Sequence, residues 1–350
     1  MSEFHRFNKI LIIPLVMVSL VLVATSLYLD KPSNGNMTRV GGFSDNDYGW
    51  NQPQESYRTP LYQLNRSNYQ GYSDLVVLGD SFSSGSPRMS WVNYVVESTG
   101  ASAQVFHFDH GGVERILNSP AFKRTPPKYL VIQSIEASLY RRFSAQGCQM
   151  PPPQASHMRV HAPMINAGHY QTHPVTRETV QSGLNLDNAA SYLARSIPRA
   201  LGVNVTDTFR LALTRDDLFS SRIKDQVLIH EGDIAKRELP PGSDAVMACN
   251  LLQVQQQIEA NGYTRMVIMV APDKLTAYSQ VLQDQAFAGL SIIPALATHR
   301  ALNLIRLDLL LQQRVREGVV DLYLPNDTHW GSTGYQLAAE AIIEYLNEDE

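Results

Sequence analysis

Residues 75–85 of the chain read LVVLGDSFSSG, and this stretch decides the fold that we expect. Four apolar residues lead into Gly79-Asp80-Ser81, a pattern typical of a buried strand that ends in a tight turn. Gly79 would permit the sharp exit from the strand. Ser81 would then lie at the carboxyl end of the sheet, where open α/β folds bind their ligands. The stretch predicts a nucleophilic serine, with an ordinary turn and helix cap as the alternative.

Similar apolar runs recur along the chain and alternate with amphipathic segments such as Trp91–Ser98 and Leu251–Ala260. The runs are Leu75–Leu78, Gln104–Phe108, Tyr129–Ile135, Met266–Val270 and Leu302–Leu307. The clearest helix begins near Ser332 and keeps its apolar residues on one face as far as Leu346. Buried strands that alternate with helices predict an α/β domain over residues 71–350, with a parallel sheet and helices on both faces.

A second informative stretch, LYLPNDTHWGSTGYQLAAEAI, spans residues 322–342 and runs into that helix. Asp327 lies two residues before His329, so its carboxylate can turn back onto the imidazole Nδ1. This contact would fix the tautomer and leave Nε2 free to accept a serine proton. Together with Ser81 the pair predicts a Ser-His-Asp triad. The alternative for the pair is an Asx-type helix cap beside a surface histidine.

A triad also needs hydrogen-bond donors for the oxyanion of the tetrahedral intermediate. The amide of Ser81 is one candidate, because amides that open a helix can face developing negative charge. Gly111 or Gly112, which follow the second apolar run in HFDHGGVERI, would supply another. Glycines of this kind also serve as plain loop residues.

Two His-x-x-x-His pairs form a rival constellation, because on a helix each pair could bind zinc. The pairs are His157 with His161, and His169 with His173. Pro163, Gly168 and Pro174 interrupt the region, and no acidic residue lies among the histidines. We therefore expect no metal and no cofactor, and we interpret these residues as surface or substrate-contacting histidines.

Residues 144–250 break the alternation of strands and helices, and we interpret them as an insertion between the third and fourth strands. The insertion could form a lid or a substrate-binding subdomain. Cys148 and Cys249, the two cysteines of the chain, bracket it closely. Because an exported chain meets oxidising conditions, we expect a disulfide at the base of the insertion. Two unpaired thiols are the alternative.

The N-terminus indicates where the protein resides. Residues 10–29 form an apolar stretch of about the length that spans a bilayer. Arg6 and Lys9 precede it, which favours a cytoplasmic segment 1–9 and a membrane anchor. A cleaved signal peptide is the alternative, since Ala24-Thr25-Ser26 resembles a cleavage site. Residues 30–70 are polar and read as a linker that packs in part on the domain.

The charge of the chain excludes one class of partner. The net charge is −4 and the isoelectric point is about 6.2. These values give no basic surface for nucleic acid, so we expect no nucleic-acid partner.

The motifs together resemble a known superfamily. Gly-Asp-Ser after the first strand, a glycine after the second and a C-terminal Asp/His pair are similar to the SGNH (GDSL-like) hydrolases. GDSF, DTHW and the stretch VIMVAPDKLTAYSQVL, residues 267–282, resemble the AlgX/AlgJ-type polysaccharide O-acetyltransferases more closely. The resemblance covers about residues 72–143 and 251–347 and implies an SGNH-like, flavodoxin-like sheet.

The chain departs from these families in three places. The serine precedes the Asp-x-His pair here, whereas the alginate enzymes have the reverse order, so the domain resembles a circular permutation of theirs. The sequence IQSIEAS, residues 132–138, replaces the Gly-x-Asn-Asp block of SGNH hydrolases, so their oxyanion asparagine is absent. Glu136-Ala137 stands where the acetyltransferases tend to have Glu-Arg.

The resemblance implies an extracytoplasmic O-acetyltransferase that forms an acetyl ester on Ser81 and passes the acetyl group to a polysaccharide hydroxyl. It also implies a membrane-bound O-acyltransferase as the acetyl donor. The protein would be a single-pass protein of the inner membrane, with its catalytic domain in the periplasm. Lys274 and Tyr278 would contact the glycan; a salt bridge at the strand end and ordinary packing are the alternative.

Two further functions remain open from the sequence. A carbohydrate or acyl esterase would use the same triad, because only the acceptor, a sugar hydroxyl or water, separates the two reactions. A non-catalytic glycan-binding or assembly protein could retain the same scaffold, since the third SGNH block is absent.

Overall fold

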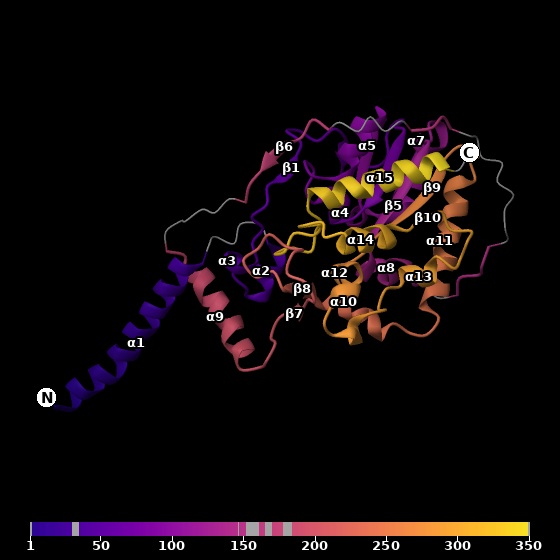
Figure 1. The fold of residues 1–350 in the computed structure, drawn as a ribbon. Coiled ribbons are helices and arrows are strands. Elements are labelled where there is room, and N and C mark those ends of the chain that lie inside the picture. Colours follow the sequence, from indigo (N-terminus) through magenta and orange to yellow (C-terminus); the bar gives the residue numbers. More distant parts are fainter. Residues whose placement is uncertain are drawn as a thin grey trace.

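Six strands, all parallel, form the central sheet of the domain (Figure 1). The structure is a computed structural model that describes residues 2–29, 35–145, 147–151, 161–164, 170–177 and 184–348. Across the sheet the strands are β10 (Leu304–Ile305), β9 (Arg265–Ala271), β5 (Tyr129–Ile135), β3 (Leu75–Gly79), β4 (Ala103–His107) and β2 (Gln63–Asn65). The predicted α/β class with a parallel sheet is therefore confirmed.

Five of these strands coincide with the apolar runs of the sequence. β5 has the predicted bounds, whereas β10 is shorter than the predicted run Leu302–Leu307. The sixth strand, β2, was not predicted. Because β2 is a three-residue edge strand with mostly exposed side chains, it carries no apolar pattern to reveal it.

Helices cover both faces of the sheet, because successive side chains of each strand point to opposite faces. On β3, Leu75 and Val77 enter one core, and Val76 and Leu78 enter the other. The first core is closed by α5 (Trp91–Thr99), α14 (Leu307–Arg316) and α15 (Ser332–Glu348). The second is closed by α6 (Gly112–Leu117), α7 (Pro120–Arg124), α8 (Glu136–Phe143), α11 (Ser243–Glu259) and α13 (Ile293–Leu296).

Short elements connect these layers. They are α4 (Ser81–Ser84), α10 (Glu231–Ala235) and α12 (Lys274–Ala277), with the 3₁₀ helices η1 (Phe108–His110), η2 (Lys236–Glu238), η3 (Ser279–Val281) and η4 (Gln285–Phe287). Of these, α4 and α12 follow directly on the carboxyl ends of β3 and β9.

Residues 35–70, most of the segment that we interpreted as a linker packing in part on the domain, form helices and strands that contact the domain. They contain α2 (Asn36–Gly41), α3 (Asp45–Tyr48), β1 (Gln54–Ser56) and β2. β1 pairs antiparallel with β6 (His173–Val175), and β2 pairs with β4. Met37, Tyr48 and Tyr57 are buried, and this apolar burial is why the segment folds against the domain.

The predicted insertion also packs on the domain. It contains α9 (Leu186–Ala200) and an antiparallel pair, β7 (Thr208–Ala212) and β8 (Gln226–His230). Leu213, Leu218 and Phe219 join the first hydrophobic core. A lid or substrate-binding role for this segment stays a prediction.

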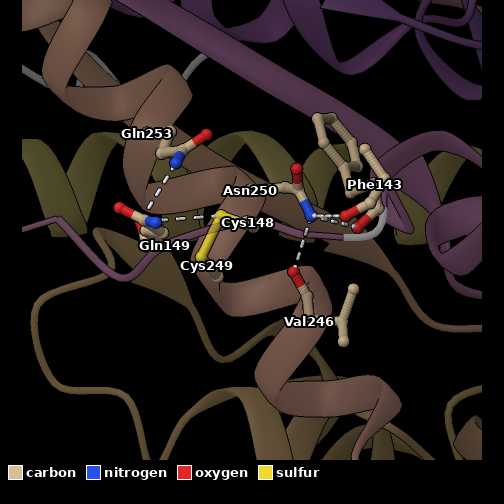
Figure 2. The surroundings of a disulfide bond; sticks show 8 residues. Phe143, Cys148, Gln149, Val246, Cys249, Asn250 and Gln253 are labelled. Carbon is tan, nitrogen blue, oxygen red and sulfur yellow. Dashed lines mark hydrogen bonds between the residues drawn. A yellow bond between two sulfur atoms is a disulfide. The ribbon is translucent and has the colours of Figure 1, made fainter.

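A disulfide joins the two ends of the insertion, as the positions of the cysteines predict (Figure 2). Cys148 and Cys249 have Cα atoms 6.0 Å apart. Next to the bond, the side chain of Asn250 in α11 donates hydrogen bonds to the carbonyls of Phe143 and Ala145. The disulfide therefore ties the chain after α8 to α11.

Replacing both cysteines with serine is expected to lower the free energy of unfolding by about 4–5 kcal/mol, because the bond closes a long loop in the unfolded chain. The two cysteines are 101 residues apart. Urea unfolding of the full chain in detergent, without reductant, measures the difference. Wild type treated with reductant is the control and should match the variant. A variant as stable as the oxidised wild type would contradict the prediction.

The N-terminal helix α1 (Ser2–Tyr28) projects away from the domain (Figure 1). Its segment Phe7–Tyr28 is long and apolar enough to cross a membrane, and little of it is buried against the rest of the chain. An apolar helix of this kind is either a signal segment or an anchor. Together with the disulfide, it favours a location outside the cytoplasm for the domain.

Candidate active site

Ser81 lies at the carboxyl edge of the sheet, where β3 ends and α4 begins. Asp80 caps α4, with its Oδ1 accepting a hydrogen bond from the amide of Phe82 at 3.1 Å. As the first residue of α4, Ser81 has an amide without a partner inside the helix. Its side chain is half-buried, so the hydroxyl is anchored and still reachable.

Asp80 is held from several sides, and this fixes the backbone immediately before Ser81. Its Oδ2 accepts hydrogen bonds from the Ile135 amide at 2.6 Å and from Arg142 at 2.7 Å. Its Oδ1 also accepts one from the amide of the Gln133 side chain at 2.9 Å. Arg142 thereby neutralises a carboxylate that is only 4% exposed. Neither Arg142 nor Gln133 could be recognised from the sequence motifs.

Gly79 has no room for a side chain. A Cβ at this position would lie 2.5 Å from Ser83 Oγ and 2.8 Å from Gln133 Oε1. Its φ does not fall in the left-handed region. A larger residue would displace the side chains of Ser83, in the helix that follows the strand, and of Gln133. This close approach is compatible with the predicted sharp exit, which stays a prediction.

His329 brings the C-terminal loop to Ser81. Its Nε2 lies 2.8 Å from Ser81 Oγ, and its Nδ1 lies 2.6 Å from Asp327 Oδ1. The amide of His329 also donates to Asp327 Oδ1 at 3.0 Å, so the carboxylate turns back over its own loop. The Phe82 ring packs against the imidazole, with ring centroids 4.9 Å apart. The structure thus brings together the three residues that the sequence analysis selected.

Asn36 completes the surroundings of Asp327 from the other end of the chain. Its amide donates to Asp327 Oδ2 at 3.0 Å. Its side chain donates to Thr328 Oγ1 at 2.9 Å and accepts from the Thr328 amide at 3.1 Å. The sequence offered no signal for Asn36, because the contact joins residues 291 positions apart.

Asp327 is ionised more readily than an ordinary aspartate. Burial would raise its pKa, but hydrogen bonds and charge from His329 and the amide of Asn36 hold the pKa below its usual value. Because the pKa is lower in the folded protein, the stability that this group contributes is present near neutral pH. That stability is lost as the pH falls through the folded pKa.

Lys274 lies beneath the same loop. It is 2% exposed, and its Nζ donates to the carbonyls of Leu324 at 2.7 Å and Pro325 at 3.1 Å. Burial lowers the pKa of Lys274 to about 7, against the opposing effect of Asp327 and other carboxylates. Tyr278 is fully buried between Phe219 and Tyr323. Because both side chains are buried, neither is exposed for contact with a glycan. Direct glycan contact stays a prediction, which this burial does not support.

Gly111 and Gly112, the predicted oxyanion donors, follow η1 at the end of β4. β4 lies beside β3, with Gly79 opposite His107. Both glycines have positive φ values, +117° and +61°, which side-chain-bearing residues rarely adopt. They lie at the same edge of the sheet as Ser81, and their role as donors stays a prediction.

The predicted histidine pairs divide between described and undescribed parts of the chain. His157 and His169 lie outside the described residues. His161 contacts the carbonyl of Tyr263 at 2.8 Å through Nε2, and His173 is in β6. Among the described residues, no group of three or more His, Cys, Asp or Glu side chains could hold a metal ion.

Comparison with protein families supports the resemblance seen in the sequence. Residues 235–350 match the family described as "SGNH hydrolase-like domain, acetyltransferase AlgX". The matched segment includes Lys274, Asp327 and His329, whereas Ser81 lies outside it. No curated protein and no solved structure matched the chain.

Proposed function

We propose, from the AlgX-type SGNH hydrolase-like match over residues 235–350, that the protein is an O-acetyltransferase that acts on a polysaccharide outside the cytoplasm. The observation that carries this proposal is the chain of hydrogen bonds from Ser81 through His329 to Asp327. This arrangement suits covalent acyl transfer, in which one group is first the base and then the acid.

In the first half-reaction, Ser81 Oγ attacks the carbonyl carbon of an acetyl donor, and His329 Nε2 takes the hydroxyl proton. The donor C–O bond then breaks, and His329 returns the proton to the leaving oxygen. Asp327 stabilises the imidazolium that forms between these events. The Ser81 amide, with Gly111 or Gly112, would donate to the oxyanion.

In the second half-reaction, a polysaccharide hydroxyl attacks the acetyl-serine ester and gives its proton to His329. The ester bond to Ser81 breaks, and the proton passes to Ser81 Oγ. The resemblance supplies a membrane-bound O-acyltransferase as the partner that presents the acetyl group. The same resemblance favours α1 as an uncleaved single-pass anchor in the inner membrane, with residues 1–9 in the cytoplasm and the domain in the periplasm.

The deciding experiment supplies the full chain in detergent with an aryl acetate and a panel of neutral and uronic-acid oligosaccharides. Mass spectrometry of protein and sugars follows the acetyl group. An acetyl adduct on Ser81 and acetylated sugar support the transferase. Acetate released into water without acetylated sugar identifies an esterase. A chain that forms no adduct and releases no acetate would overturn both enzymatic functions and leave the glycan-binding alternative.

Lys274 is proposed as a positioning residue that supports the loop carrying Asp327. Lys274→Met is expected to lower kcat by up to about 100-fold, because small displacements of catalytic groups have effects of this size. The KM for a soluble aryl acetate should change little, since the side chain does not line a surface open to the ester. Lys224→Met, at an exposed lysine, is the matched control.

A second readout tests whether Lys274 is buried in solution. The pKa of Lys274 falls from 10.5 to about 7 on folding, so the unfolded chain binds the extra proton between these values. Wild-type stability should therefore rise with pH across this window, by about 1.4 kcal/mol per pH unit, and Lys274→Met should lack this contribution. Unchanged kcat with a raised KM for oligosaccharide would instead indicate glycan contact.

A further inference from the structure

Helix α9 is amphipathic, but its apolar side faces outward. Four apolar residues recur at intervals of four or seven residues along α9 and just past its end, which places them on one side of the helix. They are Leu186, Ala190, Ile197 and Leu201. Leu186 is 45% exposed, Ile197 54% and Leu201 78%. The turn that follows adds Val203 and Val205, which are 55% and 53% exposed. An exposed apolar surface of this extent usually marks an interaction site.

The polar side of α9 is the one that packs on the domain. Arg199 donates hydrogen bonds to the carbonyls of Gly41 and Gly42, and its guanidinium lies 3.8 Å from the centre of the Phe43 ring. Tyr192 and Arg195 lie on this same side and are partly buried. A helix of a water-soluble domain normally packs in the opposite orientation, with its apolar stripe toward the core.

The position of α9 indicates what covers its apolar side. The amide of Asn185, which caps α9, donates to Ser26 Oγ near the end of α1 at 2.6 Å. Ala189, one turn further, is fully buried, and α1 and α9 contact each other. Figure 1 shows both helices leaving the domain on the same side. The exposed apolar surface therefore continues directly from the segment Phe7–Tyr28, which is suited to lipid.

We propose that the apolar side of α9 and the turn Leu201–Val205 insert into the surface of the bilayer that α1 crosses. The partner is lipid: the acyl chains cover Leu186, Ile197 and Leu201, and the polar side stays on the protein. Asp187 is the one acidic residue between Leu186 and Leu201, and the two basic residues, Arg195 and Arg199, lie on the polar side, so the apolar side carries little charge to desolvate. The domain then rests on the membrane at two places, α1 and α9. This inference does not depend on acetyl transfer.

The test uses a fluorescent label at one position of the full chain. Because both native cysteines are in the disulfide, an introduced thiol is labelled selectively. Leu201→Cys carries an environment-sensitive dye, and Ile197→Cys repeats the measurement one turn earlier. Leu309→Cys in α14, where the leucine is 53% exposed, is the matched control. Each protein is placed in nanodiscs with and without lipids brominated near the headgroup end of the acyl chain.

The labels at 197 and 201 are expected to emit at shorter wavelength than the label at 309 and to be quenched several-fold more by brominated lipid. Emission at 201 that matches the control would overturn the proposal. A blue-shifted label that brominated lipid does not quench, and that responds to protein concentration, would also overturn it and show that a second copy covers the face. Aryl-acetate hydrolysis or the unfolding temperature verifies that each labelled chain is folded.

Discussion

Ser81→Ala is expected to lower the rate of aryl-acetate cleavage by about 10⁶-fold, the loss seen when the nucleophile of a serine triad is removed. The residual rate would come from binding and oxyanion donors alone. The acetyl adduct found by mass spectrometry on the wild-type chain should also disappear. The fold should not change, because His329 Nε2 is the one hydrogen-bond partner of the Ser81 hydroxyl among the described residues.

Ser86→Ala is the matched control for this variant, because Ser86 is exposed and lies five positions beyond the nucleophile. It should retain the wild-type rate and the adduct. A Ser81→Ala protein that kept the wild-type rate of acetate release would exclude Ser81 as the nucleophile. The glycan-binding alternative predicts that neither variant changes binding to oligosaccharides.

The sheet could be predicted because its strands are encoded locally. A strand such as Tyr129–Ile135 is buried on both faces, so it begins with four consecutive apolar residues and the run is visible without knowledge of its neighbours. β2 and the segment around α2 carry no such run. Their places depend on pairing with β4 and on contacts with the C-terminal loop, which the local sequence does not encode.

The residues of the candidate site also fall into two groups: those that a local motif reveals, and those that only the fold brings to the site. Ser81 could be selected because a chemical motif follows a recognisable strand, and His329 because a carboxylate stands two residues before it. Gln133 and Arg142 are ordinary residues in the sequence and become important only when β5 and α8 lie against Asp80. For Lys274 the resemblance implied contact with the glycan, with a salt bridge at the strand end as the alternative, whereas burial beneath the loop of Asp327 favours a supporting role.

The segment that follows α1 contacts the loop that carries Asp327. Asn36, which follows α1 by a few residues, donates its amide to Asp327. The next residue in α2, Met37, donates its amide to the carbonyl of Asn326 in the same loop. The part of the chain nearest the N-terminal apolar helix is therefore part of the surroundings of the proposed catalytic carboxylate. Deletion of residues 35–41 would therefore remove hydrogen bonds around Asp327 and would also shorten the connection between α1 and the domain.

Asp327→Asn is expected to lower kcat for acetate release by about 10⁴-fold, as in a serine triad whose aspartate becomes an amide. Three donors converge on the native carboxylate: the amide and Nδ1 of His329 on Oδ1, and the amide of Asn36 on Oδ2. An asparagine has one acceptor oxygen and one NH₂ group, so it cannot satisfy donors on both sides.

Both orientations of the new amide are unfavourable. If its NH₂ faces His329, the imidazole must accept at Nδ1 and carry its proton on Nε2, which can no longer take the proton of Ser81. If its NH₂ faces Asn36, two donors oppose each other, and the imidazolium formed during reaction loses its negative partner. Single-turnover mass spectrometry separates this variant from Ser81→Ala, because a slow acetyl adduct on Ser81 should still form. A loss of less than about tenfold would show that Asp327 orients the loop rather than the imidazole.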